Sequence, residues 1–368
     1  KLSGGLDMQC KKYKVDRVQG TGRFEDGKHV SVEHSDGANS HIKFKRCIIA
    51  TGSRSIELKG VQIESPRVLT SRTALELEDI PKTLLVLGGG YIGLELGQVY
   101  ATFGSKVTVV EMLPGLMPGV DRDLARPLLR RLNEQFEQIC LETKVVGMKE
   151  VKGGIEVAFE GKQVPKSTKF DKVLVSVGRR PNTRELQLDK AGVAIDERGF
   201  IKVDAGFRTS AQRIYAIGDV IGNPMLAHKA MHEGTVLAEI LAGKNEVFEP
   251  RAIPAVVFTD PAIAWAGLTE DEAKQKKIDI SMHKIPWSAS GRAVSIGRTD
   301  GVTKLIVDKK SQRVLGVGIT GTHAGEMIAE GVLAIEMGAT AYDLAKAIHP
   351  HPTLSEMLGE AASLAGEH

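Results

Sequence analysis

The sequence has few cysteines and no long apolar run. Its three cysteines are Cys10, Cys47 and Cys140. Their spacing matches neither a zinc pattern nor a Cys-x-x-Cys pair, so we predict free thiols in a reducing compartment, no metal site and a cytoplasmic location. Apolar stretches such as TLLVLGGGYIG are short and interrupted by glycine, which predicts no transmembrane helix and no membrane partner. The chain begins KLSGGLDMQCKKYK, without an initiator methionine, and we expect a fragment or a processed chain.

Charge of one sign is not in large excess either. The formal net charge is +3, and lysine and arginine are spread along the chain. Such a charge is too small and too dispersed for a nucleic-acid-binding surface, so no nucleic-acid partner is predicted. The balance of 42% hydrophobic and 26% charged residues is typical of a globular protein with a core of ordinary size.

Strands and helices alternate in the middle of the chain. Residues 82–180 contain the apolar runs TLLVLGG, KVTVVEM and FDKVLVSVG, separated by two segments with helical spacing, the second interrupted and kinked by Pro127. This pattern predicts a parallel sheet covered by helices. Residues 12–50 predict short antiparallel strands. Beyond residue 250 the pattern changes to hairpin strands followed by helices, which predicts an α+β domain.

A glycine-rich turn joins the first of these runs to its helix. Gly88, Gly90 and Gly93 form a Gly-x-Gly-x-x-Gly motif, and the next strand ends at Glu111. These glycines permit a tight turn and a close approach of pyrophosphate to the helix N-terminus, and the acid can bind the adenosine ribose. Because the acid disfavours a 2′-phosphate, NAD is predicted rather than NADP. Tyr91 could cover the nicotinamide pocket or only pack at the start of the helix.

Two histidines near the C-terminus each precede a proline, in the stretch HPHPTLSE at 349–356. Pro350 and Pro352 fix φ and bias the preceding residues away from helix, which would hold an imidazole in one place. The alternative interpretation is a surface turn before the last helix. Glu356 follows His351 by five residues and could orient it. No role can be assigned to His349, and no third ligand suggests a metal site there.

Six stretches together resemble one family. They are IIATGS at 48–53, the glycine turn, SVGRRPNT at 176–183, YAIGDV at 215–220, PMLAHKAMHEG at 224–234 and HPHPTLSE. They occur in the order found in the flavoprotein disulfide reductases, the pyridine nucleotide–disulfide oxidoreductases. The resemblance implies an α/β fold with two Rossmann-like domains for FAD and NAD and a C-terminal α+β dimerisation domain. It divides the chain into a partial FAD-binding domain (1–75), an NAD-binding domain (76–180), the continued FAD-binding domain (181–250) and an interface domain (251–368).

Within that family the chain is most similar to the bacterial-type dihydrolipoamide dehydrogenases, through PMLAHKAMHEG and IPWSASGRA at 285–293. This resemblance implies oxidation of protein-bound dihydrolipoamide with FAD and a redox disulfide, and electron transfer to NAD+. The implied partners are a second copy of the chain and the lipoyl domains of 2-oxo acid dehydrogenase complexes or of the glycine cleavage system. Two alternatives stay open: a disulfide reductase of glutathione or mercuric reductase type, and a non-catalytic NAD-binding dimerisation fragment.

The resemblance also implies roles for single residues. His351 would be the base that takes the dithiol proton, and Glu356 would orient it. The residues implied for FAD are Gly22, Thr51, Gly52, Ser53, Gly218, Asp219, Met225, Leu226, Ala227 and His228. Those implied for NAD are Gly88, Gly89, Gly90, Tyr91, Ile92, Gly93, Leu94, Glu95, Glu111, Val145 and Gly178. The family's first Gly-x-Gly-x-x-Gly loop and its Cys-x-x-x-x-Cys helix do not occur in the sequence, so we expect that this chain alone cannot exchange thiols with disulfides.

Overall fold

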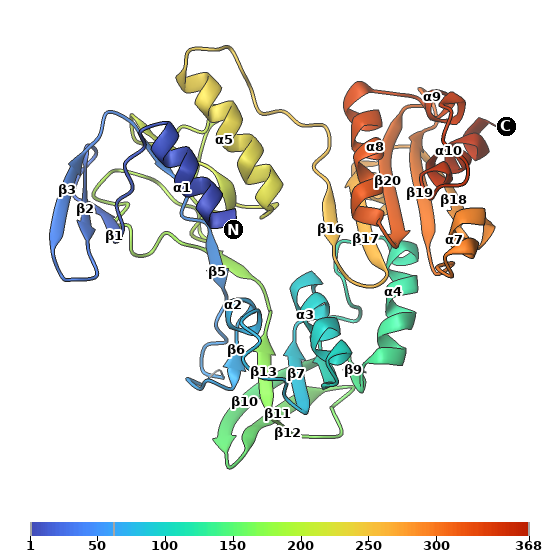
Figure 1. Cartoon of the computed structure of the whole chain (residues 1–368), viewed down its shortest axis with the longest axis horizontal. Coiled ribbons are helices and arrows are strands. Elements are labelled where there is room, and N and C mark those ends of the chain that lie inside the picture. The colour runs from blue at the N-terminus through green and yellow to red at the C-terminus, as the bar shows by residue number, and fades with distance from the viewer. Residues whose placement is uncertain (1, 62, 367–368) are drawn as a thin grey trace. The chain divides into compact units, whose positions relative to one another are not determined.

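The chain separates into two compact units (Figure 1). The computed structural model describes residues 2–61 and 63–366. The units comprise residues 1–54 with 179–248, and residues 55–178 with 249–368. No helix within the described part of the chain is long and apolar enough to cross a bilayer. The four-part domain division predicted from the sequence stays a prediction.

Small sheets and one long helix build the first unit. Its elements are α1 (Leu2–Lys12), β1 (Thr21–Phe24), β2 (His29–Glu33), β3 (Asn39–Lys43), β4 (Cys47–Ile49), β14 (Arg179–Pro181), β15 (Ile214–Ala216) and α5 (Ala227–Leu241), with β5 (Ser53–Ser55) at the boundary. Strands β1, β2 and β3 form an antiparallel sheet, and β4 pairs with β15 in parallel. Phe24, Ile49 and Ile214 are buried in one core.

The first of the predicted strands, KVDRVQGTGRF at residues 14–24, is shorter in the structure. Residues 13–21 are all exposed, and β1 begins only at Thr21. A strand gains stability from side chains that pack against neighbours, and this stretch has none to bury before Phe24.

A parallel sheet forms the first half of the second unit. Its order is β6-β13-β7-β8-β9, from β6 (Val68–Leu69), β7 (Thr83–Leu87), β8 (Lys106–Val110), β9 (Gln138–Cys140) and β13 (Lys172–Val175). Leu84, Leu85 and Val86 are fully buried, as expected for a strand covered on both faces. Strands β8 and β9 are added on one side of β7 and β13 on the other, so the order in which strands are added reverses at β7. In open α/β sheets ligands bind beyond the carboxyl ends of strands at such a point.

Helices and an antiparallel hairpin complete this half. They are α2 (Ser71–Ala74), α3 (Tyr91–Thr102), α4 (Arg122–Gln135), and the sheet of β10 (Thr143–Val151), β11 (Gly154–Gly161) and β12 (Lys169–Phe170). The helix predicted around Pro127 is confirmed, and α4 continues through the proline to Gln135.

An antiparallel sheet forms the second half of the unit, in the order β16-β17-β20-β19-β18. Its elements are β16 (Ala255–Val257), β17 (Ala262–Gly267), α6 (Glu270–Lys276), β18 (Ile280–Pro286), α7 (Gly291–Ser295), β19 (Val302–Asp308), β20 (Val314–Gly321), α8 (Ala324–Met337), α9 (Ala341–Lys346) and α10 (Glu356–Ser363). The hairpin followed by helices that was predicted beyond residue 250 is therefore present. The long helix α8 runs beside β20 (Figure 1).

Helices α8 and α4 cover opposite faces of this sheet. A Cβ on Gly331 of α8 would lie 2.9 Å from the Val317 side chain. A Cβ on Gly318 would lie 2.3 Å from Leu124 Cδ1 of α4. Residues 317 and 318 are neighbours on β20, and neighbouring side chains point to opposite faces. The C-terminal sheet is thus buried on both faces, one of which packs against the helix of the first half.

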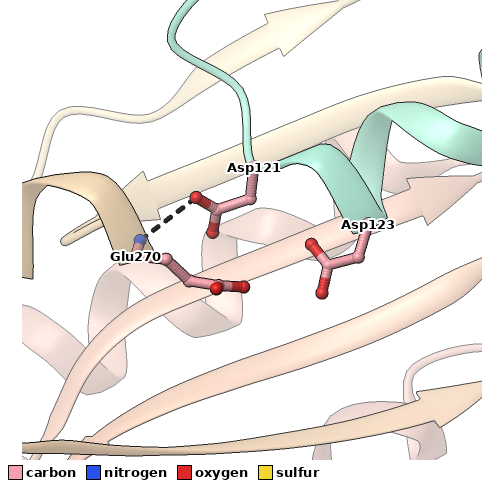
Figure 2. A group of neighbouring side chains, drawn as sticks. All are labelled: Asp121, Asp123 and Glu270. Atoms are coloured by element: carbon pink, nitrogen blue, oxygen red, sulfur yellow. Dashed lines mark hydrogen bonds between the residues drawn. The ribbon is translucent and has the colours of Figure 1, made fainter.

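A buried ammonium group joins these two halves. Lys304 on β19 is 1% exposed, and its Nζ lies 2.7 Å from Asp121 Oδ2 and 3.2 Å from Asp123 Oδ1. It also contacts Glu270 at the start of α6. Figure 2 shows the three carboxylates converging, with the Glu270 N–H donating to Asp121. Their spacing would suit a metal ion, but the cation at their centre is the chain's own lysine.

The charges of this cluster stabilise one another. Burial lowers the pKa of Lys304, but its hydrogen bonds to Asp121 and Glu270 outweigh burial and raise the pKa above the ordinary lysine value. Burial raises the pKa of Asp123, and the hydrogen bond from Lys284 and the charge of Lys304 together bring it below the ordinary aspartate value. Lys304 and Asp123 are therefore held in their charged forms.

The first prediction concerns the substitution Lys304→Met. It leaves Asp121 buried without its cation, and removing one partner of a buried ion pair costs about 3–5 kcal/mol. We expect a loss of that size in the free energy of unfolding, measured by urea titration.

Lys309→Met is the matched control, because Lys309 forms a 2.7 Å pair with Asp279 in which the side chains are 54% and 78% exposed. An exposed pair contributes at most about 1 kcal/mol, so this variant should stay close to the wild type. Equal losses in the two variants would contradict the assigned role of Lys304.

Candidate functional site

The glycine turn lies between β7 and α3, at the carboxyl end of β7. Gly88 has φ +102°, a conformation that favours glycine, and a Cβ there would lie 2.6 Å from the Ser176 carbonyl oxygen. A Cβ on Gly93 would lie 2.4 Å from the Gly88 carbonyl oxygen, so helix and strand pack closely at that residue. Gly90 precedes the first helical residue and has open space in the direction of a Cβ. The turn thus offers a bare helix N-terminus suited to a pyrophosphate.

Glu111 is placed at this turn by backbone hydrogen bonds. Its Oε2 accepts from the Gly89 N–H at 2.6 Å, and its Oε1 accepts from the Leu113 N–H at 2.7 Å. The carboxylate is therefore fixed beside the glycine turn at the end of β8, where an acid can bind a ribose hydroxyl. The structure brings together the turn glycines and the acid that the motif predicted, while their role in binding NAD stays a prediction.

The other residues predicted for NAD are spread around this half of the unit. Ile92 and Leu94 belong to α3, where Leu94 is fully buried, and Tyr91 is its first residue. Val145 lies on β10 and is partly buried. Gly178 has φ +128° and accepts a hydrogen bond from the Ile56 N–H.

Glu95, on α3, is also among the residues predicted for NAD. In the structure its Oε1 accepts a hydrogen bond from the Phe258 N–H at 2.7 Å. Burial raises the pKa of Glu95, and the bond from Phe258 opposes that rise. The carboxylate therefore links α3 to the segment after β16, a contact that the sequence did not indicate.

The second prediction separates the two functions of the turn glycines, which are binding of pyrophosphate and close packing of the helix on the strand. Gly90→Ala meets no atom within 4 Å, so it should cost at most about 1 kcal/mol, the preference for glycine over alanine before a helix. It should nevertheless weaken NADH binding about tenfold or more, a change of about 1.4 kcal/mol. Urea unfolding and NADH fluorescence measure the two effects.

Gly93→Ala is the matched comparison. Its Cβ would collide with Gly88 and Ser176, so the loss should appear mainly in stability, at about 1–3 kcal/mol. If Gly90→Ala binds NADH as the wild type does, the turn is a packing feature only.

A second turn, in the first unit, gathers several residues predicted for FAD. Ser53 Oγ donates to Asp219 Oδ2 at 2.5 Å, and Arg179 Nε donates to Ser53 Oγ at 2.7 Å. Gly52 and Gly218 have φ values of +70° and +77°. The Asp219 side chain keeps 23% of its surface exposed. The arrangement presents one oriented carboxylate that can accept a hydroxyl hydrogen bond.

An amide side chain closes the same turn. Thr51 Oγ1 donates to the Asn182 carbonyl at 2.9 Å, and Asn182 Nδ2 donates to the Thr51 carbonyl at 2.8 Å. The Asn182 N–H also donates to the Gly52 carbonyl. The stretches IIATGS and SVGRRPNT, which are far apart in sequence, therefore meet here.

Helix α5 begins immediately after the predicted segment Met225–Leu226. Leu226 precedes the first helical residue, and Ala227 and His228 lie in the first turn, where backbone N–H groups point outward. Gly22 lies apart on β1, opposite Val32 of β2. The structure thus places Ala227 and His228 at a helix start and Gly22 in a small antiparallel sheet.

Sequence reasoning missed a buried ion pair behind the second turn. Lys229 and Glu233, one helical turn apart on α5, are 7% and 1% exposed, and their charged atoms are 2.7 Å apart. Glu233 Oε2 also accepts from the Gly218 N–H at 2.7 Å. Glu233 therefore fixes the residue before Asp219. The spacing of a lysine and an acid four residues apart was visible in sequence, but a pair so spaced usually lies on an exposed helix face.

The third prediction tests this support. Glu233→Ala leaves the Lys229 ammonium buried and unpaired, which should lower the free energy of unfolding by about 3–5 kcal/mol. Glu239→Ala on the same helix removes a more exposed pair with Lys244 and should cost less than about 1 kcal/mol. Thermal and urea unfolding give the values. Similar losses in the two variants would mean that the buried pair is unimportant.

The C-terminal histidine and its acid form the third group. His351 Nδ1 lies 2.8 Å from Glu356 Oε1, and Glu356 Oε2 accepts from the Thr353 N–H at 2.6 Å. A carboxylate can only accept, so Nδ1 carries the proton and Nε2 is left able to take one. The hydrogen bond from Thr353, followed by that from His351, lowers the pKa of Glu356. The His351 side chain is 80% exposed. The structure therefore places Glu356 in contact with His351, while the catalytic roles of the two residues stay a prediction.

Cys47 and Cys140 are unsuited to disulfide exchange. Burial raises the pKa of Cys47 and of Cys140 to about 11, and a thiol with such a pKa is a poor nucleophile at neutral pH. All three cysteines of the chain are free, as the sequence predicted.

Fold and turns together define a dinucleotide-dependent α/β protein with a C-terminal α+β domain. The chain belongs to the pyridine nucleotide-disulphide oxidoreductase family, whose model matches residues 1–234. The dimerisation domain of the same family matches residues 253–362. The family and fold class inferred from six short stretches are confirmed, and the chain is a flavoenzyme of a family that uses FAD and NAD(H).

Curated relatives agree over nearly the whole chain. The dihydrolipoyl dehydrogenase of Vibrio parahaemolyticus is 46% identical over 364 residues, which are 99% of this chain and 76% of the relative. That of Geobacillus stearothermophilus is 45% identical over 365 residues, 99% of this chain and 77% of the relative.

Solved structures show the same fold. The HOCl-induced flavoprotein disulfide reductase RclA from Escherichia coli matches with a TM-score of 0.87 at 32% identity, over 95% of this chain and 79% of that one. LpdA from Mycobacterium tuberculosis matches with a TM-score of 0.90 at 26% identity, over 99% of this chain and 80% of that one.

Proposed function

We propose that the protein is a dihydrolipoyl dehydrogenase, which oxidises protein-bound dihydrolipoamide and transfers the electrons to NAD+. Several curated relatives with this name are 42–46% identical to the chain over almost its full length. The observation that carries the proposal is the His351–Glu356 pair, because it supplies an oriented, exposed base of the kind that a dithiol substrate requires.

The proton transfer begins at His351 Nε2. A thiol reacts with a disulfide only as its thiolate, and at neutral pH a base must take the proton. Glu356 holds the proton of the ring on Nδ1, so Nε2 points its lone pair outward. When Nε2 takes the dithiol proton, the ring becomes an imidazolium whose charge the Glu356 carboxylate stabilises.

Cofactor positions follow from the two turns. Asp219 with Ser53 would hold FAD through a hydroxyl of its chain, and the start of α5 would favour negative charge near the flavin. Gly88, Gly90 and Glu111 would hold NAD. When bound, these cofactors carry the two electrons of the reaction, dihydrolipoamide + NAD+ → lipoamide + NADH + H+. The cysteine pair of that reaction is not among Cys10, Cys47 and Cys140.

We further propose that the enzyme works as a homodimer in the cytoplasm. Residues 253–362 correspond to the dimerisation domain of the family. Large apolar side chains are exposed in this region: Phe258, Leu333, Met337, Tyr342 and Ile348. Lipoyl domains of 2-oxo acid dehydrogenase complexes or of the glycine cleavage system are the proposed substrate carriers.

The fourth prediction tests the role of His351. In the intact FAD-loaded enzyme, in which the redox cysteine pair is present, His351→Gln should lower the kcat for dihydrolipoamide oxidation by about 10²–10⁴-fold, the usual contribution of a general base. The transfer of electrons from NADH to an artificial dye bypasses the dithiol step. Its rate should therefore change by less than about twofold.

Steady-state kinetics with both acceptors measures the split. His41→Gln is the control, because His41 forms an exposed 2.8 Å pair with Glu25 and neither residue has a role in the proposed chemistry. Equal loss of both activities in His351→Gln would make His351 structural and would remove the main support for the proposed function.

A further inference from the structure

His349, which neither the motif nor the proposed mechanism uses, is held far more tightly than His351. Its side chain is 12% exposed, whereas that of His351 is 80% exposed. Its Nε2 lies 2.7 Å from Glu330 Oε1, and its Nδ1 lies 3.1 Å from the Ala347 carbonyl oxygen. Because a carboxylate only accepts, Nε2 donates to Glu330. The ring is therefore fixed to helix α8, on which Glu330 lies.

The same ring packs against helix α10. A Cβ on Gly359 would lie 2.9 Å from both Cε1 and Nδ1 of His349, closer than real Cβ atoms approach. Only a glycine at this position lets the imidazole lie on the helix. His349 thus bridges α8, through Glu330, and α10, through Gly359.

Gly359 and Glu356 lie three residues apart on α10 and so share one face of that helix. Glu356 binds both the His351 ring and the Thr353 N–H. Thr353 Oγ1 also donates to the Pro350 carbonyl, and this hydrogen bond spans His351 in the sequence. The loop from residue 348 to 355 is thereby attached at both ends, and His351 stands between the attachments.

We propose that His349 is a positioning residue for His351: with Glu330 and Gly359 it fixes the loop and the helix start that hold the His351–Glu356 pair. The inference rests on the proposed role of His351 as the base. The physical reason is the exposure of His351: Glu356 orients its ring, and the ring depends on the loop backbone for its place. A displacement of about 1 Å in a reacting group can lower a rate about 10²-fold.

The experiment compares His349→Ala with His349→Gln in the intact FAD-loaded enzyme that carries the redox cysteine pair. His349→Ala removes the donor to Glu330, and we expect the kcat for dihydrolipoamide to fall about 10- to 100-fold. His349→Gln keeps an N–H donor at a similar reach and should recover most of that loss. NADH-to-dye transfer should stay within about twofold of wild type in each variant, because the misplaced group acts only in the dithiol step.

A second measurement is independent of activity. In NMR spectra of 15N-histidine-labelled protein, the ring signal of His351 is assigned because it disappears in His351→Gln. This signal should show the proton on Nδ1. His349→Ala should convert it to a mixture of tautomers, and His349→Gln should restore the wild-type signal. His41→Ala, which deletes an exposed histidine–glutamate pair, should leave the signal unchanged.

Gly359→Ala tests the same positioning role without removing His349. Its Cβ should push the ring from Glu330 and lower kcat as His349→Ala does. In a His349→Ala background the same change should have no further effect, because the new methyl group occupies the space that the ring left. Additive losses in the double variant would overturn the proposal.

The two hypotheses fail in different ways. If His351→Gln leaves the dithiol reaction intact, the proposed base is wrong, yet the tautomer measurement still tests the link from His349 to His351. If His351→Gln is inactive while His349→Ala keeps both its kcat and the His351 signal, His349 is not a positioning residue and the proposed function stands.

Discussion

Carboxylates that accept hydrogen bonds from backbone N–H groups hold the turns of this chain in place. Glu111 binds the N–H groups of Gly89 and Leu113, Glu233 binds that of Gly218, and Glu356 binds that of Thr353. In each case the acid comes from a different segment than the turn or stands at a helix start. Such charge-assisted bonds are short and strong, and they fix a turn that has little core of its own.

The second constraint is the ammonium of Lys304 among Asp121, Asp123 and Glu270. Leu124, next to this cluster on α4, fills the space above Gly318 of the C-terminal sheet. The charged contact and the apolar contact act together, because a buried charge is tolerated only where packing and hydrogen bonds keep its partners in place. The nucleotide turn and the C-terminal sheet consequently belong to one compact unit.

Much of the fold could be predicted from local patterns. The buried run TLLVL, the helix after Gly90 and the hairpin before α8 all appear where their periodicity placed them. The glycine turn was predictable too, because its three glycines serve steric needs that depend on a few neighbouring residues. The strand expected over residues 14–24 was wrong over most of its length, since alternation alone does not say whether a strand has anything to pack against.

The sequence by itself determined the family, the glycine turn with Glu111, and the pairing of His351 with Glu356, because each depends on residues close in the chain or on motifs in a fixed order. Only the tertiary structure decided the partners of Glu233, Lys304 and His349. Those contacts join residues whose helices and strands meet by packing, and a one-dimensional pattern cannot specify which charged side chain will lose its water. Of the two histidines in HPHPTLSE, His351 could be distinguished in the sequence because Glu356 follows it by five residues. Only the fold showed that His349 is held by Glu330.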